Sequence, residues 1–411
     1  MHTLLSLLLC CQILLTSCLP GIFSPVSNFL FFTQSSNPPE SQSGESAADE
    51  AVSASITAPS AILMEASTGT IIYEKNAHEV RHPASITKIM TLNLIFEALE
   101  QGKFHLNDTV TVSEHAASMG GSQVFLEAGE TQDVETMIKC ISIASANDAS
   151  VAMAEFVGGS EEAFVASMNE KAKALGMKDT HFVNCCGLDV DDHMTSAYDI
   201  ALMSRELTVK HPQIHDYCTI WMDSFTHNTA KGQKEFGLAN TNKLIRQYEY
   251  ATGLKTGSTS LAKFCLSATA EKDGMELIAV VMGAENPKNR FSDASTLLNY
   301  GFSKCRIYTD EPEEGNTSIP VKRGVNNSLS LSYANQFQYL SVKGEDFSAI
   351  TKELSLPESV EAPVKEGEKV GEIIYKLGTE EIGTVDIIAK QDIEKADFSH
   401  YLLDVFISYF S

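Results

Sequence analysis

Three short motifs stand in order along this chain of 411 residues: Ser85-Ile-Thr-Lys88, Ser145-Ala-Asn147 and Lys255-Thr-Gly257. They supply a hydroxyl nucleophile, an amine three residues away that could act as its base, a second hydroxyl with an amide, and a second cation beside a glycine. A serine acyl-transfer enzyme needs these groups when lysine takes the place of histidine.

The first motif has helical spacing. Ser85 and Lys88 are three residues apart and share one face of a helix. Because Pro83 and Ser85 are typical of a helix start, we expect Ser85 near the positive end of the macrodipole, where a developing oxyanion is stabilised. Lys88 must be neutral to act as a base, which requires burial or a neighbouring cation, and Lys255 is the candidate cation.

The second motif falls in an expected break within the helical region 134–157. There the Ser145 hydroxyl could relay a proton and Asn147 could hydrogen-bond a peptide carbonyl. The alternative is a polar helix junction with serine or asparagine capping.

The third motif precedes an apolar strand. Lys255 offers a cation for a substrate carboxylate, Thr256 offers a hydroxyl, and Gly257 would let a substrate backbone approach closely. The backbone N–H of Ser258 could complete an oxyanion hole with that of Ser85. The alternative is a strand edge beside a turn.

Two of the motifs recur elsewhere. Ser260-Leu-Ala-Lys263 also matches the first, but we expect it on a strand, where positions three apart face opposite ways. Ser35-Ser-Asn37 matches the second within a segment rich in Ser, Glu, Ala and Pro. Neither recurrence is interpreted as a site.

The apolar pattern predicts an α+β fold. Strand-type runs flank two hairpin signals, Ser67-Thr-Gly69 and Lys272-Asp-Gly274. Helical stretches that end at Gly102 and Gly176 lie between these two hairpins. Strands at both ends with helices between them predict an antiparallel sheet. Short β-type runs after about residue 312 predict a small all-β domain. The predicted boundaries are a leader at 1–18, a tether at 19–57 with order beginning near Ala58, a catalytic domain at 58–305, a β-sandwich-like domain at 306–391 and an amphipathic helix at 392–411.

The chain ends bear on location. Leu4–Leu15 is an apolar run too short to span a bilayer, and Leu15-Thr-Ser-Cys18 resembles a bacterial lipobox, so the leader is either lipidated at Cys18 or a plain signal peptide. Both indicate export. The C-terminal helix is either an in-plane membrane anchor or a helix packed on the protein.

Charge and cysteine usage exclude several partners. A net charge of −24 argues against nucleic-acid binding and against electrostatic docking on an anionic membrane. The six cysteines beyond the leader match no zinc pattern and are interpreted as reduced, buried residues. His193 with Asp189, Asp191 and Asp192 could suggest a metal site, although a solvated acidic loop is favoured.

The motifs and the text around them resemble the low-molecular-weight D-alanyl-D-alanine carboxypeptidases, the S11 serine peptidases. The matching stretches are His82–Lys88, Gly120–Leu126, Ser145–Ser150, His181–Asn184 with Gly187-Leu188, Asn240–Leu244 and Gly253–Gly257. The resemblance implies a penicillin-binding/β-lactamase-like domain with no cofactor or metal.

The resemblance also implies roles. Ser85 would attack the penultimate D-Ala carbonyl of a peptidoglycan stem peptide, Lys88 would take its proton, Ser145 would assist, and Lys255 would hold the terminal carboxylate. β-Lactams would acylate Ser85 as substrate mimics. Three departures put substrate preference in doubt: Cys185-Cys186, Thr252 where Asp is common, and Ser258 where His or Tyr is frequent.

Three other functions remain open. A β-lactamase needs fast deacylation, and no Glu-x-x-Leu-Asn of the class A type lies between Ser145 and Lys255. A D,D-endopeptidase would use the same site with a longer leaving group. A non-catalytic wall-binding module is disfavoured by the intact Ser85, Lys88, Ser145 and Lys255.

Overall fold

The computed structural model describes residues 52–229, 232–310, 318–342, 344–400 and 402. The predicted leader, with Cys18, and most of the tether lie outside these residues. Residues 52–55 form a helical turn, and Ile56 is buried. The backbone N–H groups of Thr57 and Ala58 both donate to Asp293 Oδ2, at 3.1 and 2.8 Å. The described residues before the predicted Ala58 are therefore already structured.

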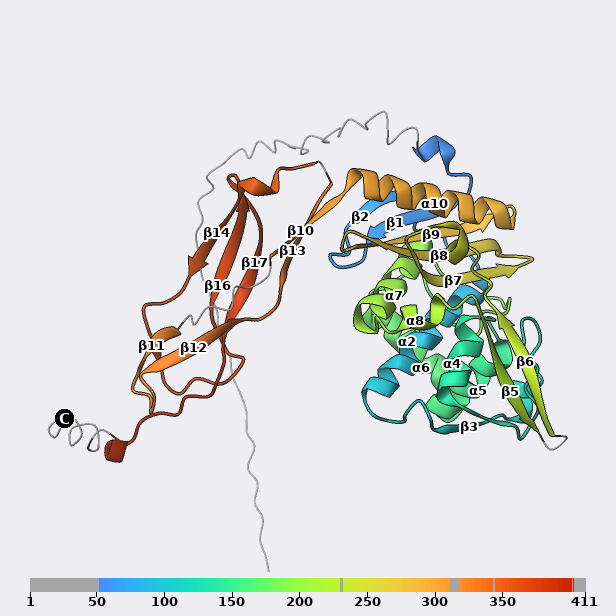
Figure 1. The fold of residues 1–411 in the computed structure, drawn as a ribbon, viewed down its shortest axis with the longest axis horizontal. Coiled ribbons are helices and arrows are strands. Elements are labelled where there is room, and N and C mark those ends of the chain that lie inside the picture. Colours follow the sequence, from blue (N-terminus) through green and yellow to red (C-terminus); the bar gives the residue numbers. More distant parts are fainter. Residues whose placement is uncertain (1–51, 230–231, 311–317, 343, 401, 403–411) are drawn as a thin grey trace, which may run out of the picture. The chain divides into compact units, whose positions relative to one another are not determined.

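An antiparallel five-stranded sheet organises the larger part of the chain (Figure 1), in the strand order β2-β1-β9-β8-β7. Its strands are β1 (Ser60–Glu65), β2 (Ile71–Lys75), β7 (Ala251–Thr259), β8 (Lys263–Lys272) and β9 (Met275–Ala284). Both predicted hairpins are confirmed, because β1 pairs with β2 and β8 with β9.

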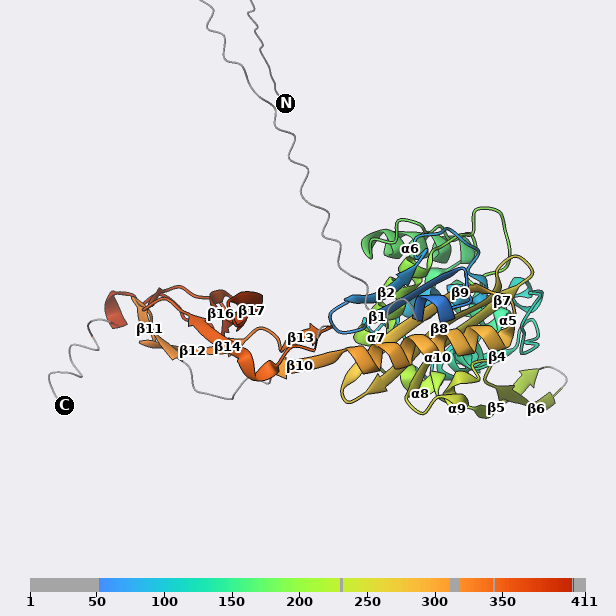
Figure 2. The ribbon, with the colours of Figure 1, turned by 90° about the horizontal axis from the view of Figure 1, so that it is seen from above.

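Helices cover both faces of this sheet. Helix α10 (Pro287–Lys304) crosses one face, as Figure 2 shows from above. The helices of the other face gather into a cluster: α2 (Lys88–Glu100), α4 (Val134–Ser142), α5 (Asn147–Gly158), α6 (Glu161–Ala174), α7 (Ala197–Lys210) and α8 (Ile214–Cys218). Strand β9 is buried on both sides: Ile278 and Val280 enter the core under the helical cluster, and Leu277 and Val281 enter the core under α10.

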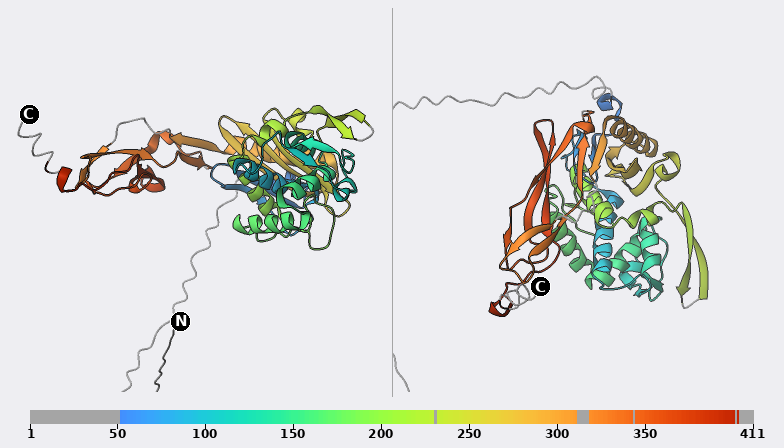
Figure 3. Two further views of the ribbon diagram at one scale, coloured as in Figure 1. Left: turned by 90° about the horizontal axis from the view of Figure 1, so that it is seen from below. Right: turned by 60° about the vertical axis from the view of Figure 1, so that its left-hand side comes forward.

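The predicted helix limits hold. Gly102 follows α2 and Gly176 follows α6, each with a positive φ (67° and 76°) that glycine adopts without strain. Smaller elements border the helical cluster: β3 (Thr109–Thr111), α3 (Glu114–Ala117), β4 (Thr131–Asp133) and α9 (Leu244–Gln247). Strands β5 (Met222–Thr229) and β6 (Gly232–Ala239) pair as a long hairpin, seen in green in Figure 3.

A C-terminal β domain follows α10, as predicted. Strand β10 (Arg306–Asp310) pairs with β13 (Phe337–Ser341). A six-stranded sheet has the order β14-β16-β17-β12-β11-β15. Its strands are β11 (Ser318–Lys322), β12 (Ser328–Tyr333), β14 (Ile350–Ser355), β15 (Val360–Glu361), β16 (Lys369–Leu377) and β17 (Glu380–Ala389), with the 3-10 turn η2 (Phe347–Ala349) before β14. Alternate residues such as Leu329, Leu331, Val385 and Ile387 form its core.

The predicted start of the C-terminal helix at Asp392 is wrong. Ile393 and Lys395 form β-bridges with Val364 and Gly324, and Ile393 is buried, so this segment belongs to the β domain. Helical structure is described only from Phe398, and residues 401 and 403–411 lie outside the described residues. Within the described residues, no helix combines the length and apolar character that a membrane span requires.

Candidate active site

Ser85 lies on the 3-10 turn η1 (Ala84–Thr87), which runs directly into α2. The predicted helix start at Pro83 and Ser85 is therefore confirmed, with a 3-10 first turn and α-helix from Lys88 onward. Ala84 has φ +49°, an uncommon conformation for a residue with a side chain. Ser85 is half-buried.

Lys88 is fully buried and points at three oxygen atoms. Its Nζ lies 3.0 Å from Ser85 Oγ, 2.6 Å from Asn147 Oδ1 and 2.7 Å from the Cys186 carbonyl oxygen. The orientation of the Asn147 amide follows from its other contact, in which Nδ2 donates to the Gly120 carbonyl at 2.7 Å. The first two motifs therefore meet at Lys88 Nζ.

Ser145 occupies the predicted break between α4 and α5, with φ +63°. Lys255 Nζ donates to Ser145 Oγ at 2.8 Å and to the Thr256 carbonyl at 3.0 Å. The backbone N–H of Asn147 donates to the Ser122 carbonyl at 2.7 Å, which ties the break to the loop at 120–126. The second and third motifs therefore meet at Ser145.

The third motif lies on β7 against the turn that carries Ser85. A Cβ at Gly257 would lie 2.9 Å from the Pro83 carbonyl oxygen and 3.1 Å from the Ile86 nitrogen. Glycine is therefore needed here because the protein's own backbone approaches closely, not only for a substrate as predicted. Thr256 is buried and Ser258 is exposed.

Burial dominates the electrostatics of both lysines. It lowers the pKa of Lys88 despite nearby groups that favour the charged form, Asp148 among them. The pKa of Lys255 is lowered well below its ordinary value by burial first and by the charge of Lys88 second. The expectation that Lys255 keeps Lys88 neutral therefore needs correction, because burial is the leading cause.

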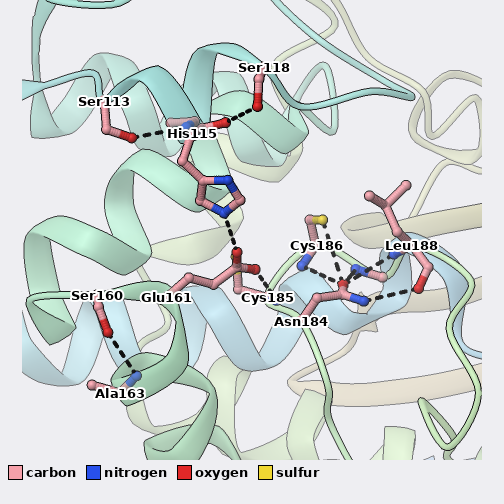
Figure 4. Close-up of polar contacts among 12 residues, drawn as sticks. Ser113, His115, Ser118, Ser160, Glu161, Ala163, Asn184, Cys185, Cys186 and Leu188 are labelled. Atoms are coloured by element: carbon pink, nitrogen blue, oxygen red, sulfur yellow. Dashed lines mark hydrogen bonds and ion pairs between the residues drawn. The ribbon is translucent and has the colours of Figure 1, made fainter.

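The loop at 184–188 supplies the carbonyl that faces Lys88. Asn184 Oδ1 accepts from the backbone N–H groups of Cys186, Gly187 and Leu188 at 3.2, 2.7 and 3.1 Å (Figure 4). Glu161 Oε1 accepts from the Cys185 N–H at 3.1 Å, while its other oxygen pairs with His115 at 2.8 Å. Both cysteines are buried with free thiols, as predicted.

Three groups at this site escaped the sequence interpretation. They are the Cys186 carbonyl, Thr241 and Arg290. Thr241 Oγ1 lies 2.7 Å from Thr256 Oγ1, and Arg290 Nη1 donates to the Gly257 carbonyl at 3.1 Å. Thr241 falls in a stretch that carried the family resemblance, but a backbone carbonyl and an arginine far along the chain leave no local signal.

The recurrent and acidic motifs have other roles. Ser260 lies in the turn after β7, not on a strand as expected, and Lys263 pairs with Glu285. Asp189 accepts from Thr259 Oγ1 at 2.8 Å, and His193 is buried against Thr87. No group of three or more potential metal ligands occurs among the residues that the structure describes.

Comparison with known proteins assigns the class. A sequence profile described as D-alanyl-D-alanine carboxypeptidase (Peptidase S11) matches residues 45–286. A second profile, described as penicillin-binding protein 5, C-terminal domain, matches residues 304–395. Penicillin-binding protein 5 from Haemophilus influenzae superposes with a TM-score of 0.67 at 29% identity, covering 83% of this chain and 98% of that one. The class is therefore that of the penicillin-binding proteins.

Curated relatives narrow the class further. The chain is 44% identical to the D-alanyl-D-alanine carboxypeptidase DacF of Bacillus subtilis over 346 residues, 84% of this chain and 88% of the relative. It is 34% identical to DacA of Escherichia coli K12 over 357 residues, 85% and 87% of the two chains. The chain belongs to the D-alanyl-D-alanine carboxypeptidase family, peptidase family S11, and is a serine-type hydrolase with that activity.

Proposed function

We propose that Ser85 is the nucleophile and Lys88 its general base. A neutral amine has two N–H donors and one lone pair. The Asn147 and Cys186 oxygens, at 2.6 and 2.7 Å, are acceptors only and would take both N–H bonds. The lone pair is then left for the Ser85 hydroxyl proton, 3.0 Å away. This arrangement at Lys88 Nζ is the observation that carries the proposal.

We propose that Lys255 holds the terminal carboxylate of the stem peptide, with Thr256 as a hydrogen-bond donor. A bound carboxylate favours the charged form of Lys255. Ser145, 2.8 Å from Lys255 Nζ, would pass the proton to the leaving D-Ala amine.

The remaining predicted residues complete the proposed site. The backbone N–H groups of Ser85 and Ser258 would stabilise the oxyanion, and Asn147 would hold Lys88 and bind a peptide carbonyl. Attack releases D-Ala and leaves an acyl group on Ser85 Oγ, and water then hydrolyses that ester. β-Lactams would acylate the same oxygen.

The test is incubation with a pentapeptide wall precursor, followed by mass spectrometry. Loss of one alanine, abolished in Ser85→Ala, supports the proposal. Release of a cross-linked partner peptide without alanine loss would favour a D,D-endopeptidase. Rapid penicillin turnover without alanine loss would favour a β-lactamase. If neither peptide nor fluorescent penicillin reacts, a wall-binding module replaces the enzyme.

We propose an extracytoplasmic location, because peptidoglycan stem peptides lie outside the cytoplasm. Membrane association through Cys18 or the segment from Phe398 onward is part of this proposal. The described end of that segment exposes Phe398 by 81%, which suits a surface that another apolar phase covers. Fractionation of cells that produce the full chain, with and without Cys18→Ala, tests the lipid anchor.

A further inference from the structure

His193 has no part in the three motifs, yet it is buried beside the nucleophile turn. Its side chain is 1% exposed and its Nε2 lies 2.8 Å from Thr87 Oγ1. Its Nδ1 lies 2.9 Å from the backbone nitrogen of Val183, which can only donate. The imidazole is therefore assigned as the neutral tautomer with its proton on Nε2, and it donates to Thr87.

Thr87 connects His193 to Ala84, the residue before Ser85. With the His193 proton on one side, the Thr87 hydroxyl donates to the Ala84 carbonyl at 2.9 Å. Ala84 holds the positive φ of +49°, which costs on the order of 1–3 kcal/mol unless neighbouring contacts maintain it. The carbonyl that Thr87 binds belongs to the peptide bond that leads into Ser85.

A second contact confines the same carbonyl. A Cβ at Gly187 would lie 1.9 Å from the Ala84 oxygen, so the loop at 184–188 packs directly on it. Segments on both sides of His193 are also anchored: Asp189 accepts from Thr259 at the end of β7, and Thr195 pairs with Arg81 just before the turn. His193 thus lies between two anchored residues and not in a solvated acidic loop.

We propose that His193 is a positioning residue for the nucleophile: through Thr87 it holds the Ala84 carbonyl, and with it the turn that presents the Ser85 hydroxyl to Lys88. This inference rests on the proposed role of Ser85. It predicts that the contact matters for the chemical step and not for the initial binding of substrate.

Two substitutions separate the two ends of the imidazole. Glutamine reaches the Nε2 position and keeps a donor for Thr87, whereas asparagine reaches only the Nδ1 position and keeps an acceptor for Val183. His193→Gln should acylate at close to the wild-type rate. His193→Asn should acylate roughly tenfold to a hundredfold more slowly, the size expected for losing one buried hydrogen bond.

Thr87 provides the matched test from the other side. Thr87→Val removes the hydroxyl at nearly constant volume and should slow acylation as much as His193→Asn, while Thr87→Ser should restore it. The double variant Thr87→Val/His193→Asn should be no slower than either single variant. His181→Gln, an exposed histidine in the same segment, is the control and should leave the rate unchanged.

The experiment measures the acylation rate constant and the non-covalent dissociation constant of a fluorescent penicillin, with the thermal midpoint of each variant. The expected result is a slower rate constant at an unchanged dissociation constant. A His193→Asn variant that acylates at the wild-type rate, or a loss that follows the thermal midpoint across all variants, overturns the inference. Peptide mapping of the label separates the two proposals: label on a residue other than Ser85 overturns the nucleophile assignment as well.

Discussion

The α+β domain, from β1 to α10, and the C-terminal β domain bury very different side chains. Beneath the helical cluster, Lys88, Lys255, Asn147, Asp148 and His193 are all nearly inaccessible. Among the described residues from 306 onward, Ser341 is the one buried polar or charged residue other than tyrosine. Burying polar groups is costly unless each is partnered, so their concentration in one domain marks where the chemistry lies.

The positions of non-glycine residues with a positive φ also distinguish the site from the C-terminal β domain. Ala84 and Ser145, each next to or within a motif, have positive φ values of 49° and 63°. In the C-terminal β domain Arg323 has φ +60° and lies on an exposed connection. Other residues of the α+β domain with positive φ, such as Asn76 and Asp273, are also exposed. At the site, by contrast, Thr87 and the loop at 184–188 contact the Ala84 carbonyl, and strain held by such contacts is typical of functional residues.

The largest expected effect comes from replacing Ser85, the proposed nucleophile. Ser85→Ala should lower penicillin acylation and D-Ala release by at least about a thousandfold, because no other hydroxyl replaces the attacking oxygen. Ser260→Ala removes the serine of the recurrent motif and should retain full activity. Equal losses in both variants would contradict the assignment of Ser85.

Removal of the base should have the next largest effect. Lys88→Met should slow acylation by roughly 10²–10⁴-fold, the range of general base catalysis. The same change leaves the Asn147 and Cys186 oxygens without their donor, so the thermal midpoint is measured beside the rate to separate lost chemistry from lost stability. Lys263→Met is the control, since that exposed lysine pairs only with Glu285 among its described ion-pair partners. Unimpaired acylation by Lys88→Met would remove Lys88 from the mechanism.

A smaller effect is expected on the stability of the α+β domain at low pH. Burial lowers the pKa of His193 from 6.5 to about 4, reinforced by His82 and His181 and opposed by Asp189. Between pH 4 and pH 6.5, the unfolded chain therefore binds a proton on His193 that the folded chain does not bind. Stability should fall by on the order of 3 kcal/mol as the pH decreases from 6.5 to 4. Urea unfolding of the wild type and His193→Gln at several pH values checks this, and equal slopes in the two proteins would contradict it.

The smallest effect on catalysis should come from the C-terminal β domain. Leu329 is fully buried on β12, and Leu329→Ala should destabilise that domain by about 2–5 kcal/mol. Turnover of a soluble peptide at low temperature should be unchanged, because the described contacts of the three motifs involve no residue of that domain. A parallel loss of turnover would show that the β domain supports the site.

Much of this fold was predictable because its signals are local. Turn residues at Gly69 and Gly274 and the apolar runs beside them specify two hairpins, and period-two alternation specifies strands such as β12. The predicted start of the C-terminal helix was too early, because Ile393 and Lys395 pair with the β domain while the described helix begins at Phe398. Tertiary pairing there overrides local propensity.

The candidate site also combines groups that the sequence predicted with groups that it did not. Side chains in the three motifs were predictable because acyl transfer demands particular functional groups in order. The Cys186 carbonyl and Thr241 were not, because their roles depend on which loops fold against α2 and β7. The sequence favoured a solvated acidic loop around His193, whereas the fold buries His193 against Thr87.

The central claim is that buried, neutral Lys88 takes the proton of Ser85. The measurement that tests it most directly is the pH dependence of the rate constant for Ser85 acylation by a fluorescent penicillin. The account predicts a rate that rises with pH through an apparent pKa below the ordinary lysine value of 10.5, and loss of that dependence in Lys88→Met. A rate independent of pH, or one that rises only near 10.5, would contradict the account.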